Sequence, residues 1–270
     1  MEWKPVDGRL KLISINLGGV WGLAENGDIF YRDGTFENYQ SPGTGWWQVE
    51  GKLEQLSVGW NSVWAVDKLG QVWYRAGIDI EHVTGTTWVN VPTDGPFKQV
   101  SVDRLGHVWA IDRKNDVYFR VGACVEQITG MFWRKVGNRR LAQLDAGKAG
   151  VWAVDENKEV FHRSGTYGEN GREGEAWIPV GPGAVLLLQL SSGGEDMMMG
   201  VTARGELYMR SGMYTTGPIG QCWKRLPGEL RMVDVYGYTA WGIDGRLRPV
   251  YTSCLPRSQV PVRMLRDTFF

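Results

Sequence analysis

Tryptophan and arginine recur at fixed positions along the chain, and together these two side chain types could bind a sugar. A Val-Trp-(Gly/Ala)-hydrophobic core occurs four times and is followed by two degenerate copies, so that its second residue falls at Trp21, Trp64, Trp109, Trp152, Met199 and Trp241. Eleven positions later stand Arg32, Arg75, Arg120, Arg163 and Arg210, with Thr252 in the sixth copy. Sugar sites combine an apolar ring face for stacking with a few fixed polar groups. We therefore predict ligand contact for Trp21, Arg32, Trp64, Arg75, Trp109, Arg120, Trp152, Arg163 and Arg210.

A β-hairpin is expected to bring each tryptophan to its arginine. Turn residues such as Asn26-Gly27 fall five and six positions after the tryptophan, and Asn-Gly is a strong signal for a two-residue hairpin loop. A hairpin centred there places the tryptophan directly opposite the arginine, so the pairs are Trp21–Arg32, Trp64–Arg75, Trp109–Arg120 and Trp152–Arg163. The alternative is that side chains at fixed repeat positions pack neighbouring repeats together.

Catalytic chemistry finds little support. The three histidines, His82, His107 and His162, have no metal-type spacing, and neither a nucleophile elbow nor a phosphate loop is present. An aspartate three positions after the core tryptophan (Asp67, Asp112, Asp155, Asp244) recurs instead, and we expect it to accept backbone N–H groups of the turn. We predict no enzyme, no metal site and no cofactor.

The repeat that positions these residues is about 45 residues long. The core residues are separated by 43, 45, 43, 47 and 42 positions. A second series, Trp3, Trp47, Trp88, Trp133, Trp177 and Trp223, opens segments of the type Trp-x-x-Val-x-Gly with steps of 44, 41, 45, 44 and 46. Both series give six copies, each with period-two alternation broken by turn residues. This pattern predicts an all-β, six-bladed β-propeller of four-stranded antiparallel blades.

The phase of the repeat predicts how the ring closes. If each Trp-x-x-Val segment is the outer strand of the blade before it, the strand around Trp3 must complete the sixth blade. We expect one domain over residues 1–270, with repeats from about 3 to 255 and a C-terminal tail at 256–270. Long polar loops at the arginine end of each hairpin (33–46, 76–87, 121–132, 164–176, 211–222) are further candidates for ligand contact.

Composition limits the partners and the compartment. Lys plus Arg and Asp plus Glu are 30 each, so bulk charge favours neither nucleic acid nor an anionic membrane. No apolar run is long enough for a transmembrane segment, and no signal peptide is evident, which suits a cytoplasmic protein or a mature secreted form. If the protein is secreted, Cys222 and Cys254 could pair and leave Cys124 unpaired; three unpaired thiols are the alternative.

The repeat resembles the tectonin repeat over residues 3 to about 252. The resemblance rests on Trp47-Gln48-Val49-Glu50-Gly51-Lys52-Leu53, then Val-Trp-Ala-Val-Asp, then an aromatic-Arg end such as Trp73-Tyr74-Arg75. It implies a non-enzymatic, multivalent lectin that recognises glycans on microbial surfaces, including lipopolysaccharide, in innate defence, and it favours secretion. Met199 and Thr252 depart from the pattern, which implies fewer than six working sites. Some members bind a cation, but no repeated acidic cluster supports one here. The alternative function is a protein–protein interaction scaffold.

Overall fold

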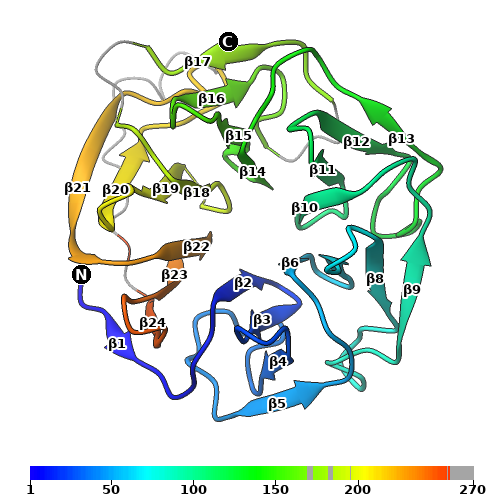
Figure 1. The fold of residues 1–270 in the computed structure, drawn as a ribbon. Coiled ribbons are helices and arrows are strands. Elements are labelled where there is room, and N and C mark those ends of the chain that lie inside the picture. The colour runs from blue at the N-terminus through cyan, green and yellow to red at the C-terminus, as the bar shows by residue number, and fades with distance from the viewer. Residues whose placement is uncertain (169–172, 182–184, 195, 254, 256–270) are drawn as a thin grey trace, which may run out of the picture.

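The chain folds into a ring of six four-stranded antiparallel β-sheets, as predicted (Figure 1). The structure is a computed structural model, and it describes residues 1–168, 173–181, 185–194, 196–253 and 255. The predicted tail at 256–270 lies outside the described residues. In each of the first five blades the four strands follow one another in sequence order, from the axis of the ring to its circumference.

Short strands separated by turn residues build every blade. Blade 1 contains β2 (Leu12–Asn16), β3 (Gly19–Leu23), β4 (Ile29–Arg32) and β5 (Trp46–Val49). Blade 2 contains β6 (Gln55–Val58), β7 (Val63–Val66), β8 (Val72–Ala76) and β9 (Thr87–Val91). Blade 3 contains β10 (Phe97–Val102), β11 (Val108–Asp112), β12 (Val117–Val121) and β13 (Phe132–Lys135).

The remaining blades repeat this plan. Blade 4 contains β14 (Gln143–Gly147), β15 (Gly150–Val154), β16 (Val160–Arg163) and β17 (Trp177–Pro179). Blade 5 contains β18 (Gln189–Ser191), β19 (Met197–Val201), β20 (Glu206–Ser211) and β21 (Cys222–Glu229). Blade 6 contains β22 (Met232–Tyr236), β23 (Thr239–Ile243), β24 (Pro249–Thr252) and β1 (Lys4–Pro5).

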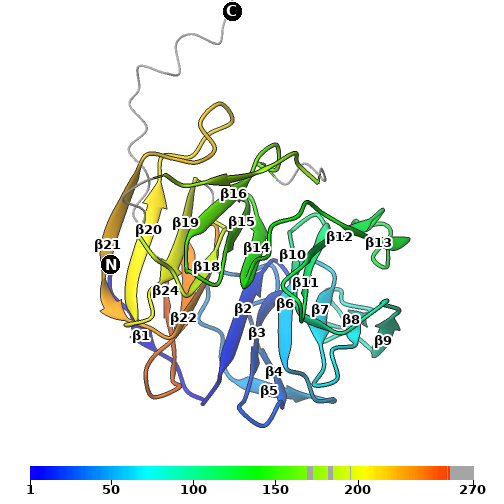
Figure 2. The same ribbon diagram turned by 45° about the horizontal axis from the view of Figure 1, so that its top comes forward.

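The N-terminal strand closes the ring, as the phase of the repeat predicted. Strand β1 pairs with β24, with Lys4 opposite Tyr251 and Pro5 opposite Val250. Blade 6 therefore takes strands from both ends of the propeller, which covers an edge that would otherwise be unpaired. Figure 2 shows, in addition, that the connection between β20 and β21 projects from the body of the ring.

The hairpin register differs by one residue from the sequence prediction. Trp21 lies opposite Tyr31, and Arg32 lies opposite Val20; the predicted Trp21–Arg32 pairing is therefore wrong. The corresponding pairs are Trp64–Tyr74, Trp109–Phe119 and Trp152–His162, which corrects Trp64–Arg75, Trp109–Arg120 and Trp152–Arg163 in the same way.

The turn explains this shift. The loop between β3 and β4 has three residues, because the amide of Ala24 bonds to the carbonyl of Asp28 and the amide of Gly27 bonds to the carbonyl of Ala24. Gly27 has a φ of 84°, the left-handed geometry of a three-residue hairpin with a bulge. The equivalent residues in the other blades also have positive φ: Gly70, Asn115, Lys158, Gly205 and Leu247. One extra loop residue moves every cross-strand partner by one position.

The repeated aspartates support these turns, as expected. Oδ1 of Asp67 accepts the amides of Leu69 and Gln71, each at 2.9 Å. Oδ1 of Asp112, Asp155 and Asp244 accepts the two equivalent amides of its own turn. The prediction that this residue serves the turn is confirmed.

The hydrophobic core lies between neighbouring blades rather than within one. Trp21 of blade 1, for example, belongs to the same buried cluster as Leu56 and Val63 of blade 2. Each sheet thus buries a face against the next sheet, and the stability of the ring depends on these junctions.

Candidate functional site

The core tryptophans are buried in the blade junctions. Trp21, Trp64 and Trp152 are 0 % exposed and Trp109 is 2 % exposed. The indole N–H of Trp21 donates to the carbonyl of Gly18, and that of Trp152 donates to the carbonyl of Ala149. These rings therefore shape the junctions from beneath the surface, and direct ligand contact by them stays a prediction.

The arginines pair with a different tryptophan, which is the first or second residue of the outer strand. In blade 1 this residue is Trp46, which lies opposite Arg32, so the strand begins one residue earlier than the predicted Trp47. The guanidinium carbon lies over the indole ring at 5.2 to 5.5 Å from its centroid in five blades: Arg32–Trp46, Arg75–Trp88, Arg120–Trp133, Arg163–Trp177 and Arg210–Trp223. The expected cation–π contact exists, but with this partner.

Each of these arginines also fixes the long loop that follows it. Nε of Arg163 donates to the carbonyl of Glu173, and Nη2 donates to the carbonyl of Gly174. The equivalent bonds from Nε end on the carbonyls of Pro42, Thr84, Thr129 and Ile219. The five arginines are between 3 and 8 % exposed. Their first role is thus to hold the loop against the outer strand.

Two of the five guanidinium groups are neutralised by a carboxylate from the neighbouring blade segment. Nη1 of Arg32 donates to Oδ1 of Asp7 at 2.6 Å. Nη1 and Nη2 of Arg75 donate to the two carboxylate oxygens of Glu50. The hydrogen bond from Arg75 lowers the pKa of Glu50 below its ordinary value.

Within the described residues, the guanidinium groups of Arg120, Arg163 and Arg210 donate no hydrogen bond to a carboxylate. Burial lowers the pKa of Arg120, Arg163 and Arg210 from the ordinary arginine value. An arginine stays protonated under these conditions, so the lowered pKa marks a charge that is poorly compensated.

The tryptophans of these three pairs also lack a bond that the tryptophans of the first two pairs make. The indole N–H of Trp46 donates to the carbonyl of Asp7, and that of Trp88 donates to the carbonyl of Glu50. Within the described residues, the buried indole N–H groups of Trp133, Trp177 and Trp223 have no hydrogen-bond partner. Buried donors without partners are unusual in folded proteins and mark places that a polar group could fill.

A crevice opens beside the Arg163–Trp177 pair, at the junction of blades 3 and 4. Its walls are the segment 137–140, which contains Arg139 and Arg140, together with Arg163 and the segment 175–177. Its three arginines exceed its one carboxylate, Glu175, so the crevice carries net positive charge. This arrangement can hold an acceptor-rich ligand at the circumference of the ring.

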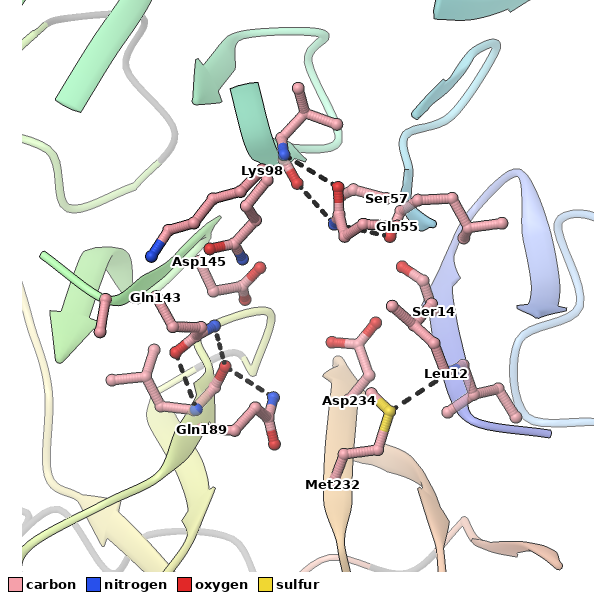
Figure 3. A pocket seen from close by; sticks show the side chains of 16 residues that line it. Leu12, Ser14, Gln55, Ser57, Lys98, Gln143, Asp145, Gln189, Met232 and Asp234 are labelled. Carbon is pink, nitrogen blue, oxygen red and sulfur yellow. Dashed lines mark hydrogen bonds between the residues drawn. The ribbon is translucent and has the colours of Figure 1, made fainter. Parts of the chain in front are cut away.

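A second hollow lies on the axis of the propeller. This cavity has a volume of about 280 Å³ and is lined by the inner strands of the blades (Figure 3). Four glutamines on its wall join neighbouring blades. The amide of Gln55, for example, donates to the carbonyl of Val100 at 2.8 Å and accepts the amide N–H of the same residue at 2.9 Å.

The side chains of the other glutamines form the same pair of hydrogen bonds with the backbone of the next blade: Gln99 with Leu144, Gln143 with Leu190 and Gln189 with Val233.

Two carboxylates also face this cavity. Serine hydroxyl groups bond across the blade junctions at Ser14, Ser57, Ser101 and Ser191. Asp145 and Asp234 take the equivalent places in blades 4 and 6 and accept the amides of Ser192 and Ile15. Burial and then the charge of Asp234 raise the pKa of Asp145 to about 7, and burial raises the pKa of Asp234.

The cavity residues were missed by the reading of the sequence. Gln55, Gln99, Gln143 and Gln189 are separated by 44, 44 and 46 positions, which is the period of the repeat itself. That spacing was the available signal. Tryptophan and arginine side chains suggest ligand contact, whereas glutamine in a strand suggests an exposed face.

The remaining candidate groups form no site. Within the described residues no group of three or more His, Cys, Asp or Glu side chains is arranged to hold a metal ion. No helix in that part of the chain is long and apolar enough to cross a membrane. Cys124 is half-buried and Cys222 is exposed, whereas Cys254, and with it the predicted pairing, lies outside the described residues.

Comparison with solved structures supports the propeller fold. Prp20p from Saccharomyces cerevisiae aligns with a TM-score of 0.56 at 13 % identity, over 84 % of this chain and 68 % of that one. YCF48 from Cyanidioschyzon merolae aligns with a TM-score of 0.55 at 14 % identity, over 88 % of this chain and 80 % of that one. At such identities the likeness shows the fold alone.

Comparison of sequences gives the family. The 31 kDa subunit of perivitellin-2 from Pomacea maculata is 33 % identical over 101 residues, which are 37 % of this chain and 34 % of the relative. Human tectonin beta-propeller repeat-containing protein 2 is 32 % identical over 100 residues, 35 % of this chain and 7 % of the relative. The matches thus span about a third or less of the length of each relative. The tectonin domain model matches residues 1–105 and 96–260, and the chain therefore belongs to the tectonin family.

Proposed function

We propose that the chain is a single-domain, non-enzymatic lectin that binds glycans of microbial surfaces, such as lipopolysaccharide, at several blade junctions. The observation that carries the proposal is the repeated pair of a buried arginine and an outer-strand tryptophan, which occurs in five blades. Sugar hydroxyl groups accept hydrogen bonds, and the junctions around Arg120, Arg163 and Arg210 hold donors that no described residue uses fully.

The junctions also suit repeated, weak binding. The repeat places similar sites around one ring, so a surface that carries many copies of a glycan can engage several of them together. Such multivalent contact raises the overall affinity by about 10² to 10⁴ over one site, without any new contact. Blades 1 and 2 close their junctions with Asp7 and Glu50, and Thr252 replaces the arginine in blade 6, so three working sites are expected.

A glycan array that includes bacterial lipopolysaccharides and methylated sugars tests the proposal. Binding to a related group of glycans, reduced for single-site fragments compared with multivalent surfaces, is the expected result. A folded protein that binds none of them contradicts the proposal.

A protein-binding scaffold is the second candidate. Met131, which directly precedes β13, and Phe132, its first residue, are 62 % and 51 % exposed, and adjacent exposed apolar side chains favour protein contacts. The human relative is named for its propeller repeats rather than for a ligand. Affinity capture with the wild-type protein and with Met131→Ser/Phe132→Ser tests this role, and the variant is expected to lose the captured protein.

A further inference from the structure

We propose that the crevice between blades 3 and 4 binds an oxyanion, a carboxylate or phosphate group carried by a saccharide. The proposal rests on the proposed glycan-binding function and specifies the ligand class for one junction. Three kinds of observation carry it: the protein's own carboxylates at two sister junctions, the missing carboxylate here, and the surplus of arginine around the opening.

The equivalent junction between blades 1 and 2 shows which groups the arginine–tryptophan pair binds. Both carboxylate oxygens of Glu50 bond to the guanidinium of Arg75, which is 3 % exposed. The backbone carbonyl of the same residue accepts the indole N–H of Trp88 at 2.9 Å. A planar guanidinium matches the geometry of a carboxylate or phosphate with two parallel hydrogen bonds. Glu50 therefore occupies the position that an external oxyanion could take at an open junction.

The junction between blades 3 and 4 is open in this sense. The segment between Val49 and Leu53 contributes Glu50, whereas the equivalent segment between Val136 and Leu141 contains Gly137, Asn138 and two arginines. Gly137 packs near both Nη1 of Arg163 and the indole of Trp177. Within the described residues, neither Nη1 of Arg163 nor the indole N–H of Trp177 donates a hydrogen bond to any acceptor.

The charge of the crevice favours an anion over a neutral sugar. Arg163 is 5 % exposed, and Arg139 and Arg140 are exposed at the entrance. Glu175 is the one acidic residue on the described wall. A buried guanidinium without a full counter-ion is costly, so an oxyanion that desolvates together with it gains a charge-assisted hydrogen bond at reduced cost. The two exposed arginines attract the same ligand over a longer range, and salt weakens that attraction.

The test uses the indole N–H signals of the ¹⁵N-tryptophan-labelled full chain, with Trp177 assigned from Trp177→Phe. Three probes are titrated at low salt: glucuronic acid, glucose 6-phosphate and methyl glucoside. We expect one or both anionic sugars to shift the Trp177 signal with an affinity at least tenfold higher than that of methyl glucoside. The stronger of the two responses identifies the oxyanion as carboxylate or phosphate. The signal of Trp88 should not shift, because Glu50 already occupies the guanidinium group of Arg75 beside it.

Three variants test the charges around the arginine–tryptophan pairs and leave the arginine and tryptophan of each pair in place. Arg140→Gln should weaken binding of the anionic probe at least threefold, whereas Arg246→Gln, a matched loss of one exposed arginine elsewhere, should not change it. Glu50→Ala opens the sister junction, and the Trp88 signal should then respond to the same probe.

The outcomes separate this inference from the lectin proposal. An equal response to methyl glucoside and to the anionic sugars overturns the oxyanion site and leaves glycan binding in place. No response of Trp177 to either anion, with a folded protein by the remaining signals, also overturns it. A blank glycan array counts against the lectin proposal, and an anion-dependent Trp177 shift would still support the oxyanion site.

Discussion

The guanidinium of Arg75 lies over the indole ring of Trp88, 5.5 Å from the ring centroid, and its Nε donates to the carbonyl of Thr84 at 2.8 Å. One side chain thereby joins the third strand of blade 2, its outer strand and the loop between them. The same group reaches Glu50 of blade 1. Arg75 therefore connects two blades and a loop. At an equivalent junction without the carboxylate, a ligand would bind a guanidinium group that is already held in place by its hydrogen bonds.

Replacing Arg75 by alanine should lower the stability of the protein. The substitution leaves the carbonyls of Thr84 and Gly85 without their donor and removes the cation–π contact. We expect a loss of about 2–3 kcal/mol in the free energy of unfolding, measured by urea denaturation. Faster hydrogen exchange in the loop 76–87 should accompany it.

Arg9→Ala is the control for this prediction. Arg9 forms an ion pair with Glu25 in which both side chains are more than half exposed. Exposed pairs of this kind contribute about 0–1 kcal/mol, so this variant should remain close to the wild type. Equal losses for Arg75→Ala and Arg9→Ala would show that the buried arginine is not a structural anchor.

The repeat made the fold predictable from the sequence, because its period is written in residues that the core requires. Trp21 and Trp64 recur since each fills the same space between two blades, and a hydrophobic side chain of that size tolerates few replacements. The closing strand near Trp3 followed from the phase of the same pattern. These features depend on local alternation and spacing, which a sequence displays directly.

The candidate sites were less predictable for two physical reasons. The hairpin register depends on whether the loop has two or three residues, and the backbone at Asn115 and Lys158 adopts positive φ without the glycine that would announce it. The partner of each arginine depends in turn on how the outer strand of the blade lies. Whether a junction is closed depends on a residue 25 positions earlier, Asp7 for Arg32 and Glu50 for Arg75, and this separation is too long for a local pattern to reveal.

Two core tryptophans should respond differently to replacement by phenylalanine. The indole N–H of Trp152 donates to Ala149 at 2.8 Å, whereas that of Trp64 has no partner within the described residues. Both rings are fully buried, so both substitutions lose a similar volume. Because Trp152→Phe also leaves a buried carbonyl without its donor, it should cost about 1 kcal/mol more than Trp64→Phe in urea unfolding. Equal costs would mean that the hydrogen bond contributes nothing net.

The cavity carboxylate Asp145 should make the protein more stable as the pH falls from 8 to 4. Its pKa is raised from the ordinary aspartate value of 3.8 to about 7 in the folded protein, so the folded state binds more protons than the unfolded state between these values. Stability gained this way is fully present below the unfolded pKa and is lost as the pH rises through the folded pKa. Asp145→Asn should remove the contribution of this side chain to the pH dependence and raise the free energy of unfolding at pH 8 by about 2 kcal/mol.

Asp94→Asn, a change at an exposed carboxylate, serves as the control for Asp145→Asn. It should leave the difference in stability between pH 8 and pH 4 close to that of the wild type. If Asp145→Asn proves no more stable than the wild type at pH 8, the carboxylate is not held at a cost.

His162 should act in the opposite direction over an overlapping range of pH. Burial lowers the pKa of this side chain from 6.5 to about 4, and its ring packs against Trp152 at 4.9 Å between centroids. Between these values the unfolded chain takes up a proton that the folded protein does not, so stability falls as the pH drops from about 7 to 4. The effects of Asp145 and His162 oppose each other, and the wild type should show a shallow pH dependence in this range.

His162→Phe separates the two contributions. Phe119 occupies the equivalent position in blade 3, opposite Trp109, so the junction accepts a phenylalanine ring there. The variant should gain stability relative to the wild type as the pH falls, by about 2 kcal/mol at pH 4.5 compared with pH 8, in urea unfolding at both values. With His162 removed, the rise in stability caused by Asp145 becomes visible, and Asp145→Asn in the same background should reduce the rise to the contribution of Asp234, whose pKa burial also raises. A variant whose stability difference from the wild type is the same at both pH values would show that the histidine titrates alike in the folded and unfolded states.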